Sequence, residues 1–418
     1  MSVLSEYGQP VPVIFFGDVE TLFAYFTEKF GQEEVENALH GRKNRILFSM
    51  VYTAKIDFYQ GNENLQLEIL AQKIRKQVHI RIIGDYDVDG VTSSHLFLTA
   101  LRRVGAKVDV VIPHRIQDGY GLSLHLLQQA KEDGVDTILT CDNGIAAIDE
   151  IAWAKAQKMT VLVTDHHAVP FEEHEGRRTE KKSLADAVVN PHQQDCGYPY
   201  KELCGAGVAW NVIRVLYENY DMDKREAEDL LDFVAMATVC DVMSLTGENR
   251  ILVKEGLKRI RHTKNIGLQA LMQACNVQPE NISAYHFGYV LGPCVNATGR
   301  LDTARHALRL FETGQETEAE EIARDLVDLN QERKELTLQG VEMAKKLCEE
   351  GGYENDPVLV LFLPDVHESI AGLIAGRIRE MYNRPVFVLT RGEEGVKGSG
   401  RSTENYSCLL YTSPSPRD

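Results

Sequence analysis

The segment Val78–Gly90 reads VHIRIIGDYDVDG and decides the fold. Its apolar first half predicts a buried strand that ends at Gly84. Three carboxylates then alternate along the chain: Asp85, Asp87 and Asp89. Thr92-Ser93-Ser94 offers N-caps for a helix that we expect to run to about Val104. The acids therefore lie on a turn at the carboxyl end of a strand, where open α/β sheets bind ligands.

The spacing of these acids favours a bound cation. Three carboxylates this close repel one another unless a cation holds them. The N-terminus of the following helix would also stabilise anionic groups or a bound phosphate. A solvated acidic turn is the ordinary alternative for a single Asp pair after a strand, but three alternating acids closed by Gly90 argue against it.

Length and composition restrict the protein class. A chain of 418 residues with 44% hydrophobic and 26% charged residues is typical of a globular protein with two or three domains. The sequence has neither an apolar run as long as a membrane span nor a signal-peptide pattern at its start. Its eight cysteines lack metal-finger spacing, so we expect a reduced, cytoplasmic protein. The net charge of −17 argues against a wholly basic nucleic-acid binder but allows a local basic groove.

From residue 78 to about 245 the pattern alternates between strand and helix. Strands are expected at 78–83, 107–112, 136–141, 160–164 and 185–189. Helices are expected at 92–104, 123–132, 146–158, 206–219 and 227–240. This alternation predicts an α/β fold with a mostly parallel sheet and helices on both faces.

Two further strands of this sheet end in groups that bind metals. Asp142 follows one strand in TILTCDNG, and Asp165-His166-His167 follows the next in TVLVTDHH. A further acid, Asp241, ends an apolar helix in ATVCDVMSL. Each has an ordinary explanation when taken alone, as a helix cap or a surface histidine. Because the carboxyl ends of parallel strands share one edge, their coincidence predicts a single site.

The motifs GDYDVDG, CDNGI, TDHH and TVCD occur in the order of the four motifs of the DHH phosphoesterase family. The chain resembles this family, and within it the RecJ-type single-strand exonucleases, over about residues 78–407. The resemblance implies a DHH catalytic domain at 78–245, and a smaller, partial α/β DHHA1 domain at 357–407. Between them we expect an all-helical connector at 246–356 with a long amphipathic helix near 316–348. Residues 1–77 form an N-terminal extension, mostly helical, to which we assign no chemistry.

The resemblance implies phosphodiester hydrolysis with two metal ions. Oxygen-rich ligands with one imidazole favour Mn²⁺ or Mg²⁺ over zinc. The expected ligands, with Asp142 bridging the ions, are Asp87, Asp89, Asp142, His166 and Asp241. Many family members carry a metal-binding His at the position of Ile83, and Asp85 is a possible substitute for it here. His167 is expected to donate to the phosphate or the leaving group, and Asp165 to orient a neighbouring imidazole.

Further segments resemble the family's nucleic-acid contacts. The loop PHRIQDGYGLS (Pro113–Ser123) supplies Arg115 and Tyr120, and GPCVNATGRLDTA (Gly292–Ala304) supplies Asn296 and Arg300. The family usually carries Arg where this chain has Cys294, so the resemblance implies no phosphate contact there. In the last domain, HESIAGLIAGRI and the predicted phosphate loop KGSGRS supply His367, Lys397, Gly398, Ser399, Gly400, Arg401 and Ser402. Residues 377–401 hold six Lys or Arg against three Glu, which predicts a local basic face.

The implied function is hydrolysis of single-stranded DNA, in the 5′-to-3′ direction, in repair and recombination. Two alternatives stay open: a phosphodiesterase for short oligonucleotides or cyclic dinucleotides, and a non-catalytic replication scaffold with the DHH fold. The chain ends in CLLYTSPSPRD (Cys408–Asp418), which we interpret as a non-native tail on a truncated domain. A native disordered tail is the alternative. The last domain shows only two clear strands, so we expect it to be loosely held.

Overall fold

The computed structural model describes residues 2–4, 10–12, 26–39, 62–174, 177–353, 356–392 and 395–403. The chain divides into two units, residues 1–57 and 58–418, and each is described by itself. In the first unit, β1 (Ser2–Leu4) pairs antiparallel with β2 (Pro10–Pro12), and α2 spans Gln32–Leu39. The suspected foreign tail, Cys408–Asp418, lies outside the described residues.

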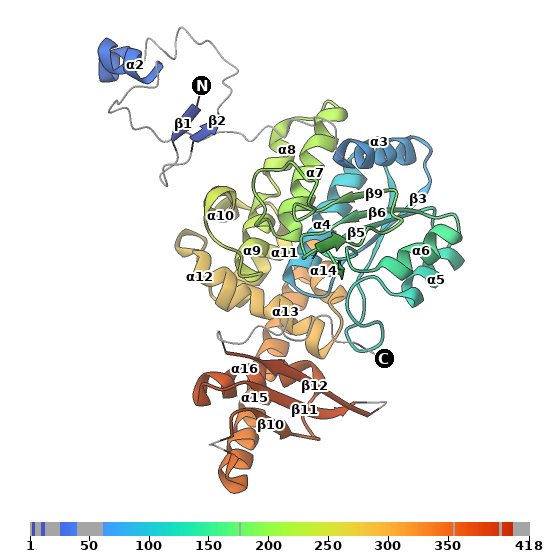
Figure 1. The fold of residues 1–418 in the computed structure, drawn as a ribbon, viewed down its shortest axis with the longest axis vertical. Helices are drawn as coiled ribbons and strands as arrows, with labels where there is room; N and C mark the ends of the chain where they lie inside the picture. The colour runs from blue at the N-terminus through green and yellow to red at the C-terminus, as the bar shows by residue number, and fades with distance from the viewer. Residues whose placement is uncertain are drawn as a thin grey trace. The chain divides into compact units, whose positions relative to one another are not determined.

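Five parallel strands form the central sheet of the second unit (Figure 1). Their order is β4 (Lys107–Val111), β3 (His79–Ile83), β5 (Thr137–Cys141), β6 (Thr160–Thr164) and β9 (Ala187–Val189). All neighbours pair in parallel, as the alternation of strands and helices predicts. Ile83 pairs with Thr140, and Cys141 pairs with Thr164. The strands β3, β5 and β6 therefore end almost level, at one edge of the sheet.

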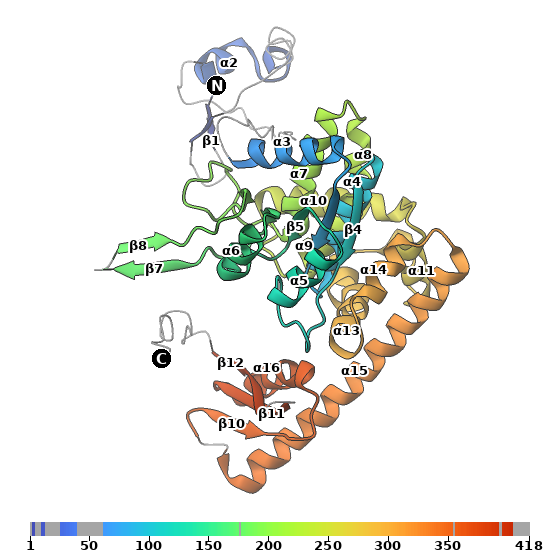
Figure 2. The same ribbon diagram turned by 90° about the vertical axis from the view of Figure 1, so that its right-hand side faces the viewer.

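Helices cover both faces of this sheet, which confirms the predicted α/β fold (Figure 2). One hydrophobic core contains Ile82 and Leu139 with residues of α4, α7 and α9, and the other contains Ile83 and Ile138 with residues of α5 and α6. Neighbouring residues of one strand thus enter opposite cores, because side chains alternate between the two faces of a sheet. The helices are α3 (Asn62–Arg75), α4 (Val88–Arg103), α5 (Leu124–Glu132), α6 (Ile148–Ala156), α7 (Gly205–Asn219), α8 (Lys224–Glu228) and α9 (Leu231–Cys240).

Helix α4 begins earlier than predicted. Its N-cap is Asp87, whose Oδ1 accepts a hydrogen bond from the Gly90 N–H at 3.0 Å. Thr92 and Ser94 lie inside the helix, and their hydroxyls donate to the carbonyls of Val88 and Gly90 at 2.7 Å each. The predicted cap at Thr92–Ser94 was wrong because Asp caps a helix at least as well as Ser or Thr and comes first in the chain.

Two other elements differ from the prediction. The single helix expected at 227–240 is two helices, α8 and α9, joined by Asp229, the C-cap of α8, and Leu230, the N-cap of α9. An antiparallel hairpin of β7 (Phe171–His174) and β8 (Arg177–Glu180) follows β6. Its charged sequence lacks the alternation of apolar and polar residues by which a strand is recognised.

A helical connector follows the sheet, and its described residues contain no strand, as the sequence predicts. Its elements are α10 (Gly247–Arg259), η1 (Ile260–His262), α11 (Ile266–Ala274), η2 (Pro279–Asn281), α12 (Ala284–His286), the π-helix η3 (Phe287–Leu291), α13 (Gly292–Leu301), α14 (Arg305–Glu312) and α15 (Glu316–Gly351). The long helix α15 packs against α11 and α13 at one end and against α16 at the other (Figure 2). None of the helices that the structure describes is long and apolar enough to span a bilayer.

The last part of the chain, which we call the second lobe, contains three strands among its described residues, where two were expected. It comprises β10 (Leu359–Phe362), η5 (Glu368–Ile370), α16 (Ala371–Tyr382), β11 (Val386–Gly392) and β12 (Gly395–Arg401). The predicted phosphate loop Lys397–Ser402 is mostly strand β12, paired antiparallel with β11. A Cβ at Gly398 would lie 2.4 Å from Leu389 Cδ2, and one at Gly400 would lie 2.7 Å from the Phe387 ring. The glycines therefore serve close strand packing, and the expectation of a two-stranded lobe was wrong.

Candidate metal centre

Three strands of the sheet deliver acidic and imidazole side chains to the edge at which they end. β3 leads into Asp85 and Asp87, β5 into Asp142, and β6 into Asp165, His166 and His167. Asp241 reaches the same place from the C-terminus of α9, where it is the C-cap. Most of these side chains are buried, so their geometry is fixed by the fold around them.

The carboxylate of Asp89 is held by the N-terminus of α7. Asp89 lies in the first turn of α4 and is only 2% exposed. Its Oδ2 accepts a hydrogen bond from the Gly205 N–H at 2.6 Å, and its Oδ1 accepts one from the Ala206 N–H at 2.8 Å. N–H groups in the first turn of a helix have no partner within the helix and stabilise negative charge. Asp89 is thus oriented from two helices at once.

Asp142 adopts a left-handed backbone conformation with a φ of 60°. The neighbouring Asn143 side chain donates from Nδ2 to the carbonyls of Ile83 at 3.0 Å and Cys141 at 2.9 Å, and thereby ties the turn to β3. A Cβ at Gly205 would lie 2.7 Å from the Cβ of Asp142. Only glycine at 205 lets α7 approach this closely, so the strained turn is enclosed from both sides.

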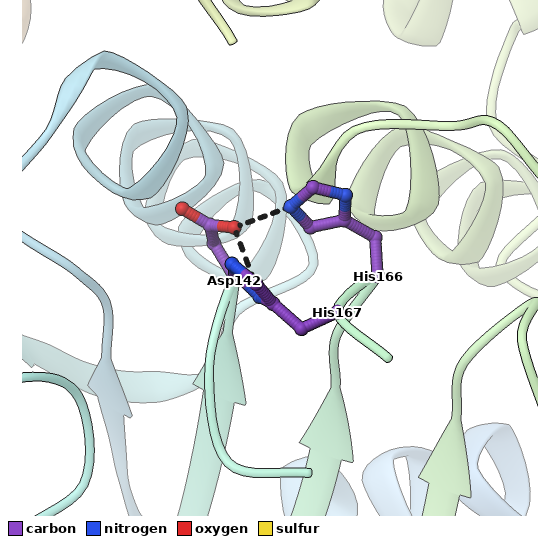
Figure 3. Close-up of side chains that lie close together, drawn as sticks. All are labelled: Asp142, His166 and His167. Carbon is purple, nitrogen blue, oxygen red and sulfur yellow. Dashed lines mark ion pairs between the residues drawn. The ribbon is translucent and has the colours of Figure 1, made fainter. Parts of the chain in front are cut away.

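The His166 imidazole faces three carboxylates. Its Nε2 lies 3.0 Å from Oδ1 of Asp142 (Figure 3), 3.6 Å from Oδ2 of Asp89 and 3.7 Å from Oδ2 of Asp241. This nitrogen is nevertheless buried without a hydrogen-bond partner among the described residues. Burial lowers the pKa of His166, so the ring is neutral at physiological pH and its lone pair is available to a metal.

The adjacent His167 is held in a different way. Its Nδ1 donates to Oδ1 of Asp165 at 2.8 Å, and its Nε2 lies 3.0 Å from the Tyr120 hydroxyl. The hydrogen bond to Asp165 raises the pKa of His167 against the opposing effect of burial. Burial also opposes ionisation of Asp165, but the bonds from His167 and from the Ile145 N–H outweigh it and keep the pKa of this carboxyl low. An ionised Asp165 therefore orients a readily protonated His167.

Three overlapping groups of donor atoms form this cluster. Within each group the atoms lie within 4.8 Å of one another; the groups are Asp85–Asp87–Asp142, Asp89–His166–Asp241 and Asp142–His166–His167. Asp142 and His166 each belong to two of them. Such an arrangement can hold two neighbouring cations that share the carboxylate of Asp142.

Without a cation the carboxyl groups of Asp85, Asp142 and Asp241 resist ionisation. Burial and the charge of Asp87 raise the pKa of Asp85 to about 7, and burial with the charge of Asp89 raises that of Asp241 to about 8. The same two causes hold the pKa of Asp142 well above its usual value. Oδ1 of Asp85 is buried without a hydrogen-bond partner in the described part of the chain. A divalent ion would satisfy this oxygen and favour the ionised carboxylates, so the residues present fit such an ion.

Comparisons with known proteins agree with this geometry. The DHH family, N-terminal domain, matches residues 79–238. The chain is 37% identical to the single-stranded-DNA-specific exonuclease RecJ of Haemophilus influenzae, over 81% of this chain and 60% of that protein. The crystal structure of exonuclease RecJ bound to manganese matches with a TM-score of 0.71 at 32% identity and covers 84% of both chains. The chain belongs to the RecJ family of DHH proteins.

A second RecJ structure, that of the Thermus thermophilus protein in complex with Mn²⁺, has a TM-score of 0.72 at 28% identity. The match covers 95% of this chain and 56% of that one. The chain thus spans about 60% of the length of the first curated RecJ relatives that it matches.

In this RecJ-family chain, residues predicted to bind nucleic acid adjoin the candidate metal site. Tyr120 is 54% exposed beside His167. The Arg115 guanidinium lies 4.1 Å from the centroid of the Tyr86 ring and donates from Nε to the Gly299 carbonyl at 3.0 Å. Tyr86 lies between Asp85 and Asp87, so Arg115 packs on the acidic turn itself.

Two residues of α13 that were predicted to bind nucleic acid contact α4 and the second lobe. Asn296 accepts at Oδ1 from the Val88 N–H at 3.1 Å, so its oxygen caps α4. Arg300 is half-buried and donates to the Ser369 carbonyl at 2.8 Å, which joins α13 to the second lobe. The side-chain oxygen of Asn296 is thus bonded to the backbone of α4, and its contact with nucleic acid stays a prediction.

The predicted residues of β12 divide between its two faces, one of which lies against α16. Side chains alternate along this strand, which places Lys397, Ser399 and Arg401 on one face and Gly398 and Gly400 on the other. A Cβ at Gly372, in the first turn of α16, would lie 2.8 Å from both Arg401 Nη2 and Ser399 Oγ.

Partners within the lobe occupy some of these groups. Lys397 forms an ion pair with Glu368 at 3.2 Å, and Nδ1 of His367 lies 2.6 Å from the Ser369 hydroxyl. The Ser402 carbonyl accepts from Arg379 at 3.3 Å. Arg401 bonds at Nη1 to the Ser399 hydroxyl and to the Gly400 carbonyl, yet it stays exposed.

The residues that hold the cluster in place were not predicted from the sequence. The N–H groups of Gly205 and Ala206 orient Asp89, and the Asn143 amide ties two strand ends together. One signal was present, because Gly205 and Gly207 stand at the start of an apolar helix, where small residues permit close packing. No pattern in the sequence indicates that this helix points its N-terminus at Asp89.

Proposed function

We propose that this chain is a metal-dependent exonuclease that hydrolyses phosphodiester bonds of single-stranded DNA, in the 5′-to-3′ direction, during DNA repair and recombination. The observation that carries the proposal is the position of Asp142, whose carboxylate belongs to two donor groups at the edge of the sheet. Relatives named single-stranded-DNA-specific exonuclease, at 36% and 37% identity, support the substrate.

We infer that the cofactor is a pair of Mn²⁺ or Mg²⁺ ions. The inferred ligands, with Asp142 bridging, are Asp85, Asp87, Asp89, Asp142, His166 and Asp241. RecJ structures with manganese and with Mg²⁺ support both ions. When bound, such ions activate a water molecule and neutralise the phosphate oxygens.

The chain's own residues would position the substrate and move a proton. Asp165 accepts from Nδ1 of His167 and so directs Nε2 towards Tyr120 and the cluster. Because the pKa of His167 is raised, a protonated ring can donate from Nε2 to a phosphate oxygen or to the leaving group. Asp165 is thus a positioning residue, and His167 is the group that touches the substrate.

A strand of DNA would extend from the cluster to the second lobe. Arg115 and Arg300 provide cations beside the acidic turn, and Arg401 with Ser399 provides a further phosphate contact at the start of α16. The exposed Tyr120 ring offers a face on which a base can stack. This cationic path explains how a chain of net charge −17 can hold a polyanion.

Two other functions would require less of this structure. A phosphodiesterase for short oligonucleotides or cyclic dinucleotides would use the same cluster without the second lobe. A non-catalytic scaffold would not need acids whose pKa values are raised by burial and by one another's charge around His166. The buried, unpartnered Oδ1 of Asp85 therefore favours an enzyme over a scaffold.

The test is digestion of end-labelled single-stranded DNA with Mn²⁺, beside a duplex and a dinucleotide. We expect progressive shortening of the single strand from its 5′ end, with no reaction once the metal is chelated. Hydrolysis of the dinucleotide with long strands left intact would instead favour the short-substrate phosphodiesterase. Binding of the strand without hydrolysis at any metal concentration would favour the scaffold.

A further inference from the structure

Two cysteines outside the metal centre lie close together. Cys275 is the C-cap of α11, and Cys294 lies in the first turn of α13. Their Sγ atoms are 3.8 Å apart. Cys275 is partly exposed, whereas Cys294 is 2% exposed. A thiol that reagents can reach therefore stands beside a second thiol in the core.

We propose that Cys275 and Cys294 form a reversible thiol–disulfide site that responds to small disulfides such as oxidised glutathione. The Cys275 thiolate attacks one glutathione sulfur, forms a mixed disulfide and releases one glutathione thiolate. Cys294 gives its proton to solvent and attacks the Cys275 sulfur, which releases the second glutathione thiolate. Two protein thiols are oxidised, and one oxidised glutathione is reduced to two molecules of glutathione.

The surroundings of Cys275 suit the first attack, whereas the contact with Cys275 and burial raise the pKa of the Cys294 thiol. The contact with Cys294 and the nearby Lys334 lower the pKa of Cys275 against the effect of burial, and a larger thiolate fraction speeds attack. Cys294 donates from Sγ to the Val290 carbonyl at 3.2 Å and accepts from Nδ2 of Asn330 at 3.4 Å. These contacts hold its sulfur towards Cys275.

Closing the disulfide must move part of the structure. The sulfurs have to approach by about 1.8 Å, from 3.8 Å to an S–S bond of about 2.0 Å. Movement of α13 reaches the metal centre directly, because Asn296 bonds to the first N–H of α4. The backbone at Gly299 also touches the acidic turn, since a Cβ there would lie 2.3 Å from the Tyr86 carbonyl oxygen.

The same change reaches the second lobe through α15. Asn330 lies on α15, and its Oδ1 accepts from Nη2 of Arg333 at 2.8 Å. A disulfide at Cys294 alters the contact with Asn330, and α15 continues from there to the second lobe (Figure 2). Oxidation should therefore slow hydrolysis of long strands. This consequence rests on the proposed nuclease function, whereas formation of the disulfide does not.

The first test maps disulfides in the full chain, without metal, after treatment with oxidised glutathione. We expect a peptide pair linked through Cys275 and Cys294, lighter by about two hydrogen atoms than the two free peptides. Cys275→Ser should leave Cys294 reduced, and Cys196→Ser, at another partly buried cysteine, should form the link as the wild type does.

The disulfides found in the wild-type protein test the proposed site even if a variant folds poorly. Two unmodified thiols, glutathione left on Cys275, or a link from either cysteine to a third one would overturn the proposed site. The second test measures turnover of single-stranded DNA before and after oxidation, once excess glutathione is removed.

We expect oxidation to slow turnover roughly tenfold, dithiothreitol to restore it, and Cys275→Ser to be insensitive to oxidation. Unchanged turnover of the cross-linked protein would overturn the coupling to the metal centre. A reduced protein without nuclease activity would contradict the proposed function, while the disulfide map would still decide the site.

Discussion

Oδ2 of Asp89 lies 2.6 Å from the backbone nitrogen of Gly205, so the N-terminus of α7 holds a carboxylate that the first turn of α4 presents. The Ala206 N–H bonds to the other oxygen at 2.8 Å. This relationship joins a motif at the end of the first strand to a helix more than a hundred residues later. It shows that the cluster is assembled by the tertiary packing of α4 against α7, beyond what the strand ends alone supply.

Replacing Gly205 with alanine should therefore disable the cluster. The new Cβ would lie 2.7 Å from the Cβ of Asp142 and 2.9 Å from its Oδ1, so Asp142 must move. We expect Gly205→Ala to lower turnover by tenfold or more, since small misplacements at a reacting centre are costly, roughly a hundredfold for 1 Å. Steady-state hydrolysis of labelled single strands measures this.

Gly207→Ala is the matched control. The three atoms nearest to its Cβ would all belong to the Leu203 side chain, at 3.3 to 3.8 Å, and that side chain can adjust. Alanine also favours the helix. Equal activity of the two variants would show that the approach of α7 to Asp142 does not matter.

The sequence was informative where local chemistry is strong. Apolar runs that end in Asp or His predicted the central strands within one or two residues, because strands buried on both faces must be apolar throughout. The gathering of acids at one edge followed from the topology of a parallel sheet. The sequence did not predict that Asp87 is the N-cap of α4. Whether Asp87 or Thr92 caps the helix depends on where the chain turns after β3.

Glycine was harder to interpret. The segment KGSGRS predicted a loop, yet Gly398 and Gly400 lie in strand β12. These positions are glycine because Leu389 and Phe387 on β11 leave no room for side chains there. The same holds for Gly205, whose role depends on a residue far away in the sequence. Close approach between elements is a property of packing, and a sequence pattern does not record it.

Asp232 gives folding a pH dependence outside the metal centre. Its carboxylate is buried on α9 and accepts from the Thr263 hydroxyl at 2.6 Å. Burial raises the pKa of this carboxyl to about 6, against about 3.9 in an unfolded chain. As the pH rises from about 4 to about 6, Asp232 ionises in the unfolded chain before it ionises in the folded one. The free energy of unfolding therefore falls over this range and stays at the lower value above about pH 6.

Asp232→Asn removes this ionisation. We expect the free energy of unfolding to rise relative to wild type by at most about 3 kcal/mol at about pH 7.5, and by much less at about pH 4.5. Urea denaturation at both pH values gives the two differences. A difference that is the same at both pH values would mean that Asp232 is ionised in the folded protein throughout.

Arg401 should contribute to the binding of long strands but not to chemistry. Arg401→Ala removes one cation from the face of β12 near α16, so affinity for single-stranded DNA should fall and the slope of log K against log salt should shrink by about one. Hydrolysis of a dinucleotide should stay almost unchanged, because a short substrate does not span from the cluster to β12.

Arg391→Ala is the control for charge alone. Arg391 is exposed on β11, paired with Val396 and therefore on the opposite face of the sheet. Fluorescence anisotropy at several salt concentrations compares the two variants. If both reduce the salt slope equally, the phosphate contact does not belong to the α16 face.

The central claim is that Asp142 holds two metal ions at once, and the comparison of Asp142→Ala with wild type tests it most directly. Hydrolysis of labelled single-stranded DNA and binding of the same strand are measured at matched Mn²⁺ concentrations. We predict that hydrolysis falls by several orders of magnitude while binding changes little, because phosphate contacts elsewhere supply the affinity. Turnover of Asp142→Ala close to that of wild type would contradict the account.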